Sequence, residues 1–305
     1  NGFQTHYLWE EVLQSESLLD LIENFVHIRT EKSKEYDNNQ QRIVETKKDV
    51  LIFPRYHQLN VIRKLKKSVI EEGVGNNYLI QHTTGSGKSL SIGWLSHLLS
   101  SLYQSSTDTK RMFDTIIVVT DRRVLDKQIQ NTIKQLEQTK GVVCPVDLDS
   151  NQLKEFLEQG KSIIVTTVQK FPVISNSISE LKTKSFGVVI DEVHSSQSGE
   201  TSRHLKKSLS KSILNTFNEG EDEDLTDVDK QILDEINNRG QQSHISYFGF
   251  SGTPKNKTLE LFGRKQENGE FKSFDLYSMR QSIGEGFTLD VLKDYTTYQR
   301  YFKLN

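Results

Sequence analysis

Residues 77–102, NYLIQHTTGSGKSLSIGWLSHLLSSL, join an apolar run to a helical pattern through a short loop that contains glycine. The run at 78–81 predicts a buried strand, and apolar residues recur after the loop with helical spacing, at Ile92, Leu95, Leu98, Leu99 and Leu102. A loop between a strand and a helix N-terminus directs several backbone N–H groups at one point, where the helix dipole favours negative charge. This stretch therefore predicts a phosphate-binding loop.

The side chains of this loop suit the binding of a nucleotide. Gly85 and Gly87 can adopt backbone angles that strain other residues, and they let the main chain approach phosphate oxygens closely. Lys88 supplies a charge for the β- and γ-phosphates, and the Ser89 hydroxyl can bind Mg²⁺. His82 stands where the pattern G-x-x-x-x-G-K-[ST] has its first glycine, but the G-x-G-K-S core is intact. The alternative, an ordinary glycine-rich turn, is disfavoured by the flanking strand and helix patterns.

Length and composition indicate a globular protein without a membrane segment. The chain of 305 residues can form one large domain or an α/β core with appendages. No apolar run approaches the length of a membrane span, and no secretion signal is visible at the N-terminus. The single cysteine, Cys144, excludes an internal disulfide and makes a reducing, cytoplasmic setting the default. Because the net charge is −2, any contact with DNA has to be local, with acidic residues gathered elsewhere, as in 219–229.

Further apolar runs predict a central sheet. β-branched residues without alternation are typical of strands that are buried on both faces of a parallel sheet, and such runs lie at 115–120, 162–167, 186–190 and 245–251. Helical patterns fall between them. The order of elements predicts an α/β fold of the P-loop NTPase type, in which helices flank a mostly parallel sheet.

The N-terminal part predicts a helical extension. Apolar residues form one helical stripe, at Leu18, Leu19, Ile22, Phe25 and Val26. Ser17 and Asp20 are spaced as a capping pair, so we expect this helix to begin near Ser17 and to pack on the main core. The polar residues 31–49 predict a connecting loop or a hairpin.

Polar residues follow the predicted strands and should meet at one edge of the sheet. Asp191 and Glu192 come directly after the strand at 186–190, where the first can bind Mg²⁺ and the second can polarise the attacking water. A solvated acidic turn is the alternative. Gln58 begins a helix ahead of the phosphate loop, and its amide can read an adenine edge or act as a cap or surface residue. The positions expected to converge there with the phosphate loop are Gln58, Arg122, Gln169, Asp191 and Thr253.

The motifs, taken together, resemble the first half of a superfamily 2 helicase-like motor. They are, in order, HTTGSGKS (82–89), VVTDRRVLDKQ (118–128), IVTTVQKF (164–171), DEVH (191–194) with SSQSG after it, and FSGTP (250–254). Their wording is most similar to the restriction subunit of type I restriction-modification enzymes. PRYHQ (54–58) and SLLDLIENFVHI (17–28) resemble the approach to that motor, and YSMRQSIGEGFTLDVLKDYTTY (277–298) resembles the exit from its first RecA-like lobe.

The resemblance implies an ATP-dependent motor that translocates on double-stranded DNA and acts with methylase and specificity subunits in a complex that also cleaves DNA. It implies catalytic roles for Lys88, Asp191 and Glu192, and Mg²⁺ ligands at Ser89 and Asp191. The implied ATP-binding residues are Arg55, Gln58, Thr84, Gly85, Ser86, Gly87, Lys88 and Ser89. The implied DNA-facing residues are Arg122, Arg123, Gln128, Thr167 and Gln169, and those that couple nucleotide to DNA are His194, Ser251, Gly252 and Thr253.

The same resemblance divides the chain into three parts. They are a linker or helical extension after the nuclease part at 1–50, a motor lobe at 51–265 with an acidic insertion at 209–243, and a segment toward the second lobe at 266–305. Because neither a nuclease nor a second lobe is visible, we expect a fragment whose ATPase activity is weak or absent in isolation. The alternatives are another superfamily 2 DNA or RNA helicase, and a scaffold that retains the fold for subunit docking without catalysis.

Overall fold

The structure is a computed structural model of the chain, and it describes residues 6–37, 42–105, 107–120, 123–137, 141–146, 150–167, 170–192, 242–290 and 293. All but the last two residues of the predicted acidic insertion at 209–243 lie outside these ranges.

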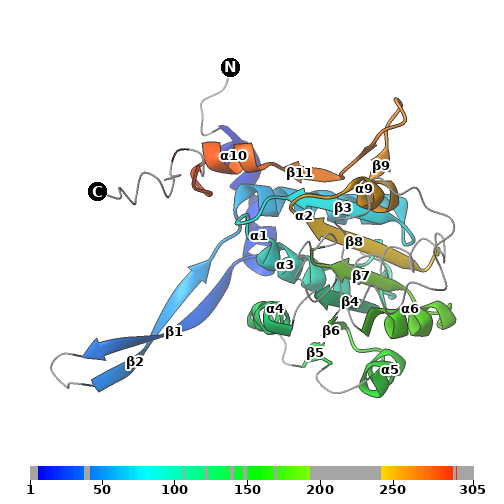
Figure 1. Ribbon diagram of the computed structural model, residues 1–305, viewed down its shortest axis with the longest axis horizontal. Coiled ribbons are helices and arrows are strands. Elements are labelled where there is room, and N and C mark those ends of the chain that lie inside the picture. Colours follow the sequence, from blue (N-terminus) through cyan, green and yellow to red (C-terminus); the bar gives the residue numbers. More distant parts are fainter. Residues whose placement is uncertain are drawn as a thin grey trace, which may run out of the picture.

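A parallel sheet of seven strands forms the centre of the described part of the chain (Figure 1). The strand order is β11-β3-β8-β7-β4-β6-β5, and every neighbouring pair runs parallel. The strands are β3 (Asn77–His82), β4 (Thr115–Thr120), β5 (Val143–Pro145), β6 (Ile163–Thr167), β7 (Phe186–Ile190), β8 (Ile245–Ser251) and β11 (Asp275–Tyr277). The predicted α/β fold with a mostly parallel sheet is confirmed.

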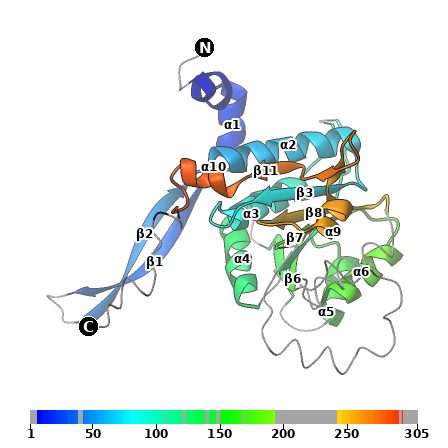
Figure 2. The same cartoon turned by 45° about the horizontal axis from the view of Figure 1, so that its top comes forward.

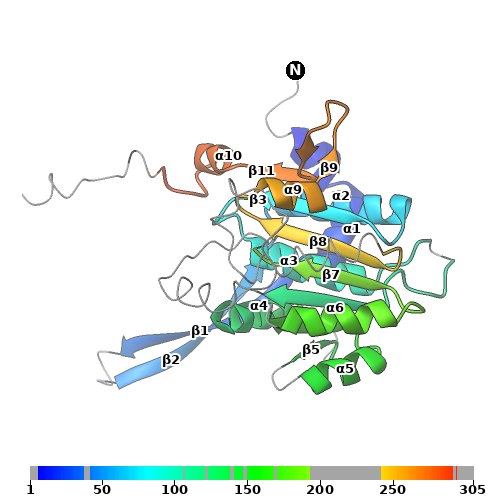
Figure 3. The ribbon, with the colours of Figure 1, turned by 45° about the vertical axis from the view of Figure 1, so that its right-hand side comes forward.

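Helices cover both faces of this sheet (Figure 3). One face carries α2 (Tyr56–Glu72), α3 (Lys88–Ser100) and α4 (Arg123–Gln135), and the other carries α5 (Ser150–Glu158), α6 (Phe171–Glu180) and α9 (Asn256–Phe262). Strand β4 explains the two layers. All six of its residues are buried, and Ile116 and Val118 belong to the first apolar cluster whereas Ile117 and Val119 belong to the second. A strand that packs on both faces needs an unbroken apolar run, which is the pattern that the sequence has there.

The N-terminal part stands apart from the sheet (Figures 1 and 2). It contains a short π-helix, η1 (Leu8–Val12), the helix α1 (Ser15–Asn24), and a long antiparallel hairpin of β1 (His27–Asp37) and β2 (Arg42–Ile52). The hairpin projects away from the body as an arm (Figure 2). The interpretation of 31–49 as a connection or a hairpin is therefore confirmed as a hairpin.

Helix α1 packs differently from the prediction. Leu19 and Ile22, which were expected to face the core, are 66% and 60% exposed, and the buried residues are Leu21 and Phe25. The carbonyl of Phe25 accepts a hydrogen bond from Trp94 Nε1 at 3.0 Å, so the end of the helix, rather than one long stripe, is docked on α3.

The predicted capping pair at this helix is also wrong. The residue before α1 is Gln14, and Ser17 and Asp20 lie inside the helix. Asp20 instead accepts from Arg63 of α2 at 2.8 Å, because the two helices meet along this side.

The C-terminal part of the described chain continues past the main α/β core. A small antiparallel pair, β9 (Arg264–Lys265) and β10 (Phe271–Lys272), follows α9. Strand β11 then joins the sheet beside β3, and the helix α10 (Met279–Gly284) comes after it. None of the helices in the described ranges is both long enough and apolar enough to cross a membrane.

Two partly buried histidines, His27 and His97, couple the stability of this fold to pH. His97 on α3 has its Nε2 2.8 Å from the carbonyl of Ile133 on α4, and burial holds the pKa of His97 below its ordinary value. Burial also lowers the pKa of His27, and the neighbouring His97 lowers it further. Because these pKa values are lower in the folded state than in the unfolded state, the unfolded chain binds more protons in acid.

We therefore expect the free energy of unfolding to fall as the pH drops through about 6.5 and below. Urea unfolding between pH 7.5 and 5.5 measures this dependence. His97→Gln keeps an amide donor for Ile133 and removes one titrating group, so the dependence should become shallower, by at most about 1.4 kcal/mol per pH unit. The same substitution at the exposed His6 is the control. An unchanged slope in His97→Gln contradicts the assignment.

Candidate nucleotide-binding site

The phosphate loop connects β3 to α3 at the carboxyl edge of the sheet. Gly85 and Gly87 have φ values of 83° and 84°, in the left-handed region that favours glycine, and Gly87 is the N-cap of α3. An added Cβ on Gly87 would lie 2.5 Å from Gln58 Nε2, so a side chain there would displace the Gln58 amide. The two glycines on which the motif was assigned therefore have the backbone conformation that the motif requires.

The start of α2 binds three successive carbonyl groups of this loop. Arg55 Nη1 donates to the carbonyl of Gly85 at 3.4 Å, and Gln58 Nε2 donates to that of Gly87 at 3.0 Å. Between them, His57 Nε2 lies 2.9 Å from the carbonyl of Ser86, so this nitrogen carries the hydrogen. These contacts hold the loop by its carbonyl side. The first amides of α3, which have no partner within the helix, suit an anion on the other side.

Gln58 forms the cap that one of its two interpretations predicted. Its Oε1 accepts from the backbone N–H of Arg55 at 2.8 Å, and the side chain is almost fully buried against the loop. Both polar ends of the amide thus have protein partners. Recognition of adenine by Gln58 stays a prediction, and it requires the amide to exchange one of these partners for the base.

Lys88 and Glu192 meet across the carboxyl ends of the strands. Lys88 Nζ lies 2.9 Å from Glu192 Oε1 and 3.3 Å from the carbonyl of His82, and the lysine side chain is only 8% exposed. Glu192 has a φ of 52°, which is unusual for a residue other than glycine, and such strain clusters at functional sites. The expected convergence of the phosphate loop with the acidic pair is therefore present in the structure.

The residues proposed for Mg²⁺ lie at two element ends. Ser89 is in the first turn of α3, and Asp191, which is 9% exposed, directly follows β7. Mg²⁺ takes oxygen ligands and is usually held by one or two protein groups together with substrate phosphates. A hydroxyl and a carboxylate fit that demand. In the described ranges, no three His, Cys, Asp or Glu side chains gather as a ready-made metal site.

The motif at the end of β8 lies beside the phosphate loop. Strand β8 lies between β3 and β7, so Ser251, Gly252 and Thr253 emerge between the loop and the acidic pair. A Cβ added to Gly252 would lie 3.5 Å from Thr84 Oγ1. The predicted coupling residues Ser251 to Thr253 thus border the nucleotide site, whereas His194 lies outside the described residues.

The predicted DNA-facing residues are only partly described. Thr167 ends β6 at the same edge of the sheet and is partly exposed. Arg122 and Gln169 fall outside the described residues. Arg123 and Gln128 belong to α4, and their side chains also lie outside what the structure describes. Their contact with DNA stays a prediction.

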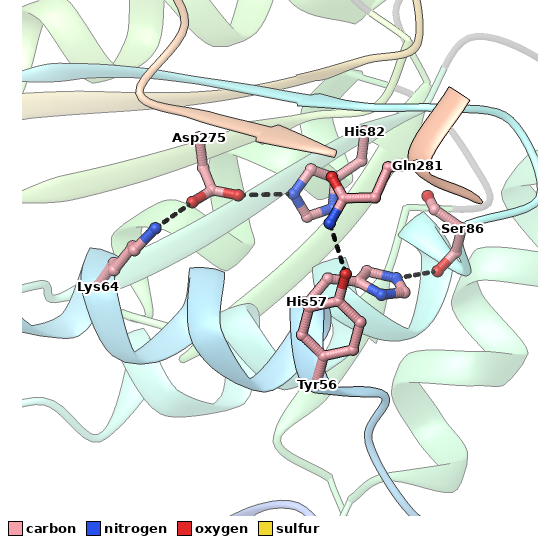
Figure 4. Close-up of polar contacts among 7 residues, drawn as sticks. All are labelled: Tyr56, His57, Lys64, His82, Ser86, Asp275 and Gln281. Atoms are coloured by element: carbon pink, nitrogen blue, oxygen red, sulfur yellow. Dashed lines mark hydrogen bonds and ion pairs between the residues drawn. The ribbon is translucent and has the colours of Figure 1, made fainter. Parts of the chain in front are cut away.

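Sequence reasoning missed a group of residues that brings the C-terminal part to the site (Figure 4). His82 is fully buried, and its Nε2 lies 2.9 Å from Asp275 Oδ1, whose other oxygen accepts from Lys64 at 2.8 Å. The ring of Tyr277 stacks on that of His57, with centroids 3.9 Å apart and planes 9° from parallel. The only signal in the sequence was the histidine in place of the first glycine of the motif.

These contacts shift two pKa values. Burial acts to raise the pKa of Asp275, but the hydrogen bonds from His82 and Lys64 outweigh it and hold the pKa below the ordinary value. For His57 the burial of the ring lowers the pKa, although the bond to the Ser86 carbonyl acts in the opposite direction. At neutral pH the site therefore contains an ionised Asp275 and a neutral His57.

Comparison with known proteins assigns this arrangement to an ATPase family. The SWI2/SNF2 ATPase family matches residues 57–218, which is more than half of the chain. The endonuclease subunit of the type I restriction enzyme SauMSSORF170P from Staphylococcus aureus is 26% identical over 259 residues, which cover 81% of this chain and 22% of that protein. The HindI endonuclease subunit from Haemophilus influenzae is 25% identical over 299 residues, which cover 93% of this chain and 24% of that protein.

Among solved structures, this chain matches a nuclease-deletion mutant of the Type ISP restriction-modification enzyme LlaGI in complex with a DNA substrate mimic. The TM-score is 0.47 at 14% identity, and the match covers 78% of this chain and 21% of that one. The Pyrococcus furiosus Hef helicase domain matches with a TM-score of 0.43 and 16% identity, over 74% of this chain and 38% of that one. This chain spans less than a quarter of the length of the restriction subunits quoted above. The resemblance found in the sequence is confirmed for this ATPase region, which is related to the endonuclease subunits of type I restriction enzymes, and the chain belongs to the SWI2/SNF2 ATPase family.

Proposed function

We propose that this chain is the ATP-binding first motor lobe of the restriction subunit of a type I restriction enzyme. In that role it is part of a translocase that moves on double-stranded DNA and serves DNA cleavage. The single observation that carries the proposal is the ion pair of Lys88 with Glu192, at 2.9 Å. It lies at the end of a phosphate loop whose two glycines, Gly85 and Gly87, have left-handed backbone angles. It brings a phosphate-binding cation and a candidate water-polarising carboxylate to one point of the sheet edge.

The geometry supports a simple sequence of events at this site. The phosphates of ATP settle on the amides of the loop and of the first turn of α3, and Lys88 turns from Glu192 to the β- and γ-phosphates. Glu192 then accepts a hydrogen bond from the attacking water and orients it toward the γ-phosphate. Ser89 and Asp191 would hold Mg²⁺, which would supply positive charge to offset the negative charge that develops during the transfer.

The larger assembly belongs to the same proposal. The motor lobe spans 51–265, the part at 1–50 connects it to a nuclease, and 266–305, which adds β11 to the edge of the lobe's sheet, leads to a second lobe. DNA is held through its backbone by Arg122, Arg123, Gln128, Thr167 and Gln169, while methylase and specificity subunits choose the sequence. The coupling role falls to His194, Ser251, Gly252 and Thr253. A complete ATPase cleft needs groups from both lobes, so this lobe alone binds ATP and hydrolyses it slowly or not at all.

Substitutions of the ion pair separate binding from hydrolysis. Lys88→Ala should abolish the binding of MgATP, measured by calorimetry on this chain, because it removes the only charge of the loop. Glu192→Gln should retain binding but lower DNA-stimulated ATPase activity of the longer subunit by about 10²- to 10⁴-fold, as expected for the loss of a general base. Lys110→Ala, at an exposed lysine, is the matched control. Undiminished binding by Lys88→Ala refutes the site, and full activity of Glu192→Gln refutes the catalytic role.

Two glycine substitutions test the shape of the loop. Gly87 and Gly269 have φ values of 84° and 86°, but an added Cβ on Gly269 meets nothing within 4 Å. Both alanine variants carry the cost of a left-handed alanine, about 1 kcal/mol. Only Gly87→Ala also displaces the Gln58 amide, so we expect it to have the lower melting temperature and to lose MgATP affinity. Equal behaviour of the two variants contradicts the packing described for the loop.

Salt titration tests the proposed contact with DNA. Binding of a DNA duplex to the longer subunit should weaken steeply as salt rises, because phosphate contacts release counterions. Removing Arg122 and Arg123 together should reduce the slope of log affinity against log salt by about 2. The control removes Lys265 and Lys272, two exposed lysines on β9 and β10. A slope that is flat, or equal in both double variants, contradicts the assignment.

A further inference from the structure

The segment 275–288, here called the C-terminal clamp, is bound to the phosphate loop where the loop leaves β3. Strand β11 pairs with β3 so that Tyr277 lies opposite His82, and the carbonyl of Tyr277 accepts from the N–H of Thr83 at 3.0 Å. The hydrogen bonds between β11 and β3 therefore continue beyond the end of β3 to Thr83 of the loop. The position where the loop leaves the sheet is fixed by two neighbours, β8 on one side and β11 on the other.

A buried polar pair connects the same two strands. His82 Nε2 must carry a hydrogen, because the Asp275 carboxylate 2.9 Å away only accepts. Both side chains are nearly inaccessible, at 1% and 8% exposure. His82 Nδ1 is buried without a partner in the described part of the chain, so a second hydrogen there would be an unsatisfied donor. The hydrogen bond from His82 Nε2 to the Asp275 carboxylate thus joins the end of β3 to the start of β11.

The clamp also holds the first turn of α2, which in turn holds the loop (Figure 4). Tyr277 stacks on His57, the residue that donates to the Ser86 carbonyl. The Glu285 carboxylate accepts from the hydroxyls of both Tyr277, at 2.7 Å, and Tyr56, at 2.5 Å. A third residue of the clamp, Gln281, donates to the Tyr56 hydroxyl at 2.6 Å.

Two residues at the end of the clamp approach the loop from outside. The Arg55 guanidinium, which donates to the Gly85 carbonyl, lies 4.2 Å from the centre of the Phe287 ring. A Cβ on Gly85 would lie 3.5 Å from Thr288 Oγ1. Three side chains bind the carbonyls of the loop, and the clamp contacts two of them, Arg55 and His57; the third is Gln58.

We propose that the C-terminal clamp sets the position of the phosphate loop for the nucleotide, and that His82 and Asp275 are its positioning residues. They do not contact phosphate. They act through the strand end from which the loop emerges and through the first turn of α2. This inference rests on the proposed binding of ATP at the loop, and it deepens it, because it places the determinants of nucleotide affinity partly outside the motif that binds the phosphates.

The decisive experiment measures MgATP affinity by calorimetry in a double-mutant cycle of His82→Gly and Asp275→Asn. His82→Gly gives the loop the glycine that the usual pattern has, so affinity should be kept or improved if the loop sequence alone decides it. The clamp predicts the opposite: each single variant binds about tenfold more weakly, as expected for the loss of a hydrogen bond to a buried charged group. The double variant should be no weaker than the weaker single variant, because both remove the same contact.

Asp20→Asn is the matched control for a merely structural effect. It removes the ion pair of Asp20 with Arg63, at 2.8 Å, which joins α2 to α1. Arg63 is the neighbour of Lys64, which binds Asp275, so the control perturbs the same helix without touching the clamp. Its melting temperature should fall while its affinity for MgATP stays within about twofold of the unmodified chain. The proposal is overturned if Asp275→Asn loses no more affinity for MgATP than Asp20→Asn does. It is also overturned if the double variant His82→Gly/Asp275→Asn loses the product of the two single fold-losses in affinity.

A second measurement keeps the test independent of His82→Gly, whose buried cavity can prevent folding. Amide hydrogen exchange at 83–91 without nucleotide should be faster in the isosteric Asp275→Asn than in Asp20→Asn, and equal rates overturn the proposal. Lys88→Ala separates the two levels of inference. If the unmodified chain and Lys88→Ala bind MgATP alike, the proposed function fails. If Lys88→Ala loses binding while Asp275→Asn binds normally, the clamp alone is wrong.

Discussion

A buried ammonium group must be paired with negative charge, and this requirement organises the carboxyl edge of the sheet. Lys88 sits at the N-terminus of α3, where the helix dipole is unfavourable for a cation, and only 8% of its side chain is exposed. Glu192 supplies the opposing charge from the end of another strand. A triphosphate carries more negative charge than one carboxylate. The ion pair therefore marks the place where the nucleotide and Glu192 compete for Lys88.

The loop around this lysine is held by elements that are far apart in the chain. Residues of the first turn of α2 bind its carbonyls, Gly252 borders it from β8, and Tyr277 extends the β-ladder into it from β11. Each contact uses groups at an element end, where the backbone has unpaired donors and acceptors. The site is therefore formed by several elements that meet at the carboxyl ends of the strands. Its geometry depends on the order of the strands in the sheet as much as on the sequence motif of the loop.

The sequence predicted the centre of this fold because its signals are local and strong. The run of β4, TIIVVT, allows no exposed face, and the G-x-G-K-S core fixes both the backbone angles and the start of α3. Helix α1 was predicted to bury its whole apolar stripe, but only the end of that stripe, at Phe25, is buried, while Leu19 and Ile22 are exposed. A short amphipathic helix that is docked by one end does not bury every residue of its stripe. In the structure Phe25 anchors that end against Trp94, and Leu19 remains exposed.

Strand β11 could not be found in the sequence, because its three residues, Asp275 to Tyr277, carry no periodicity and gain their order from β3. Its presence has a consequence for handling the protein. If the chain is cut before Asp275, β3 becomes the outermost strand, and the backbone groups from Ile80 to His82 that pair with β11 are opened to pairing with other molecules. Fragments that end at the apparent close of the α/β core are thus prone to aggregate, whereas those that extend through Thr288 keep the sheet edge covered.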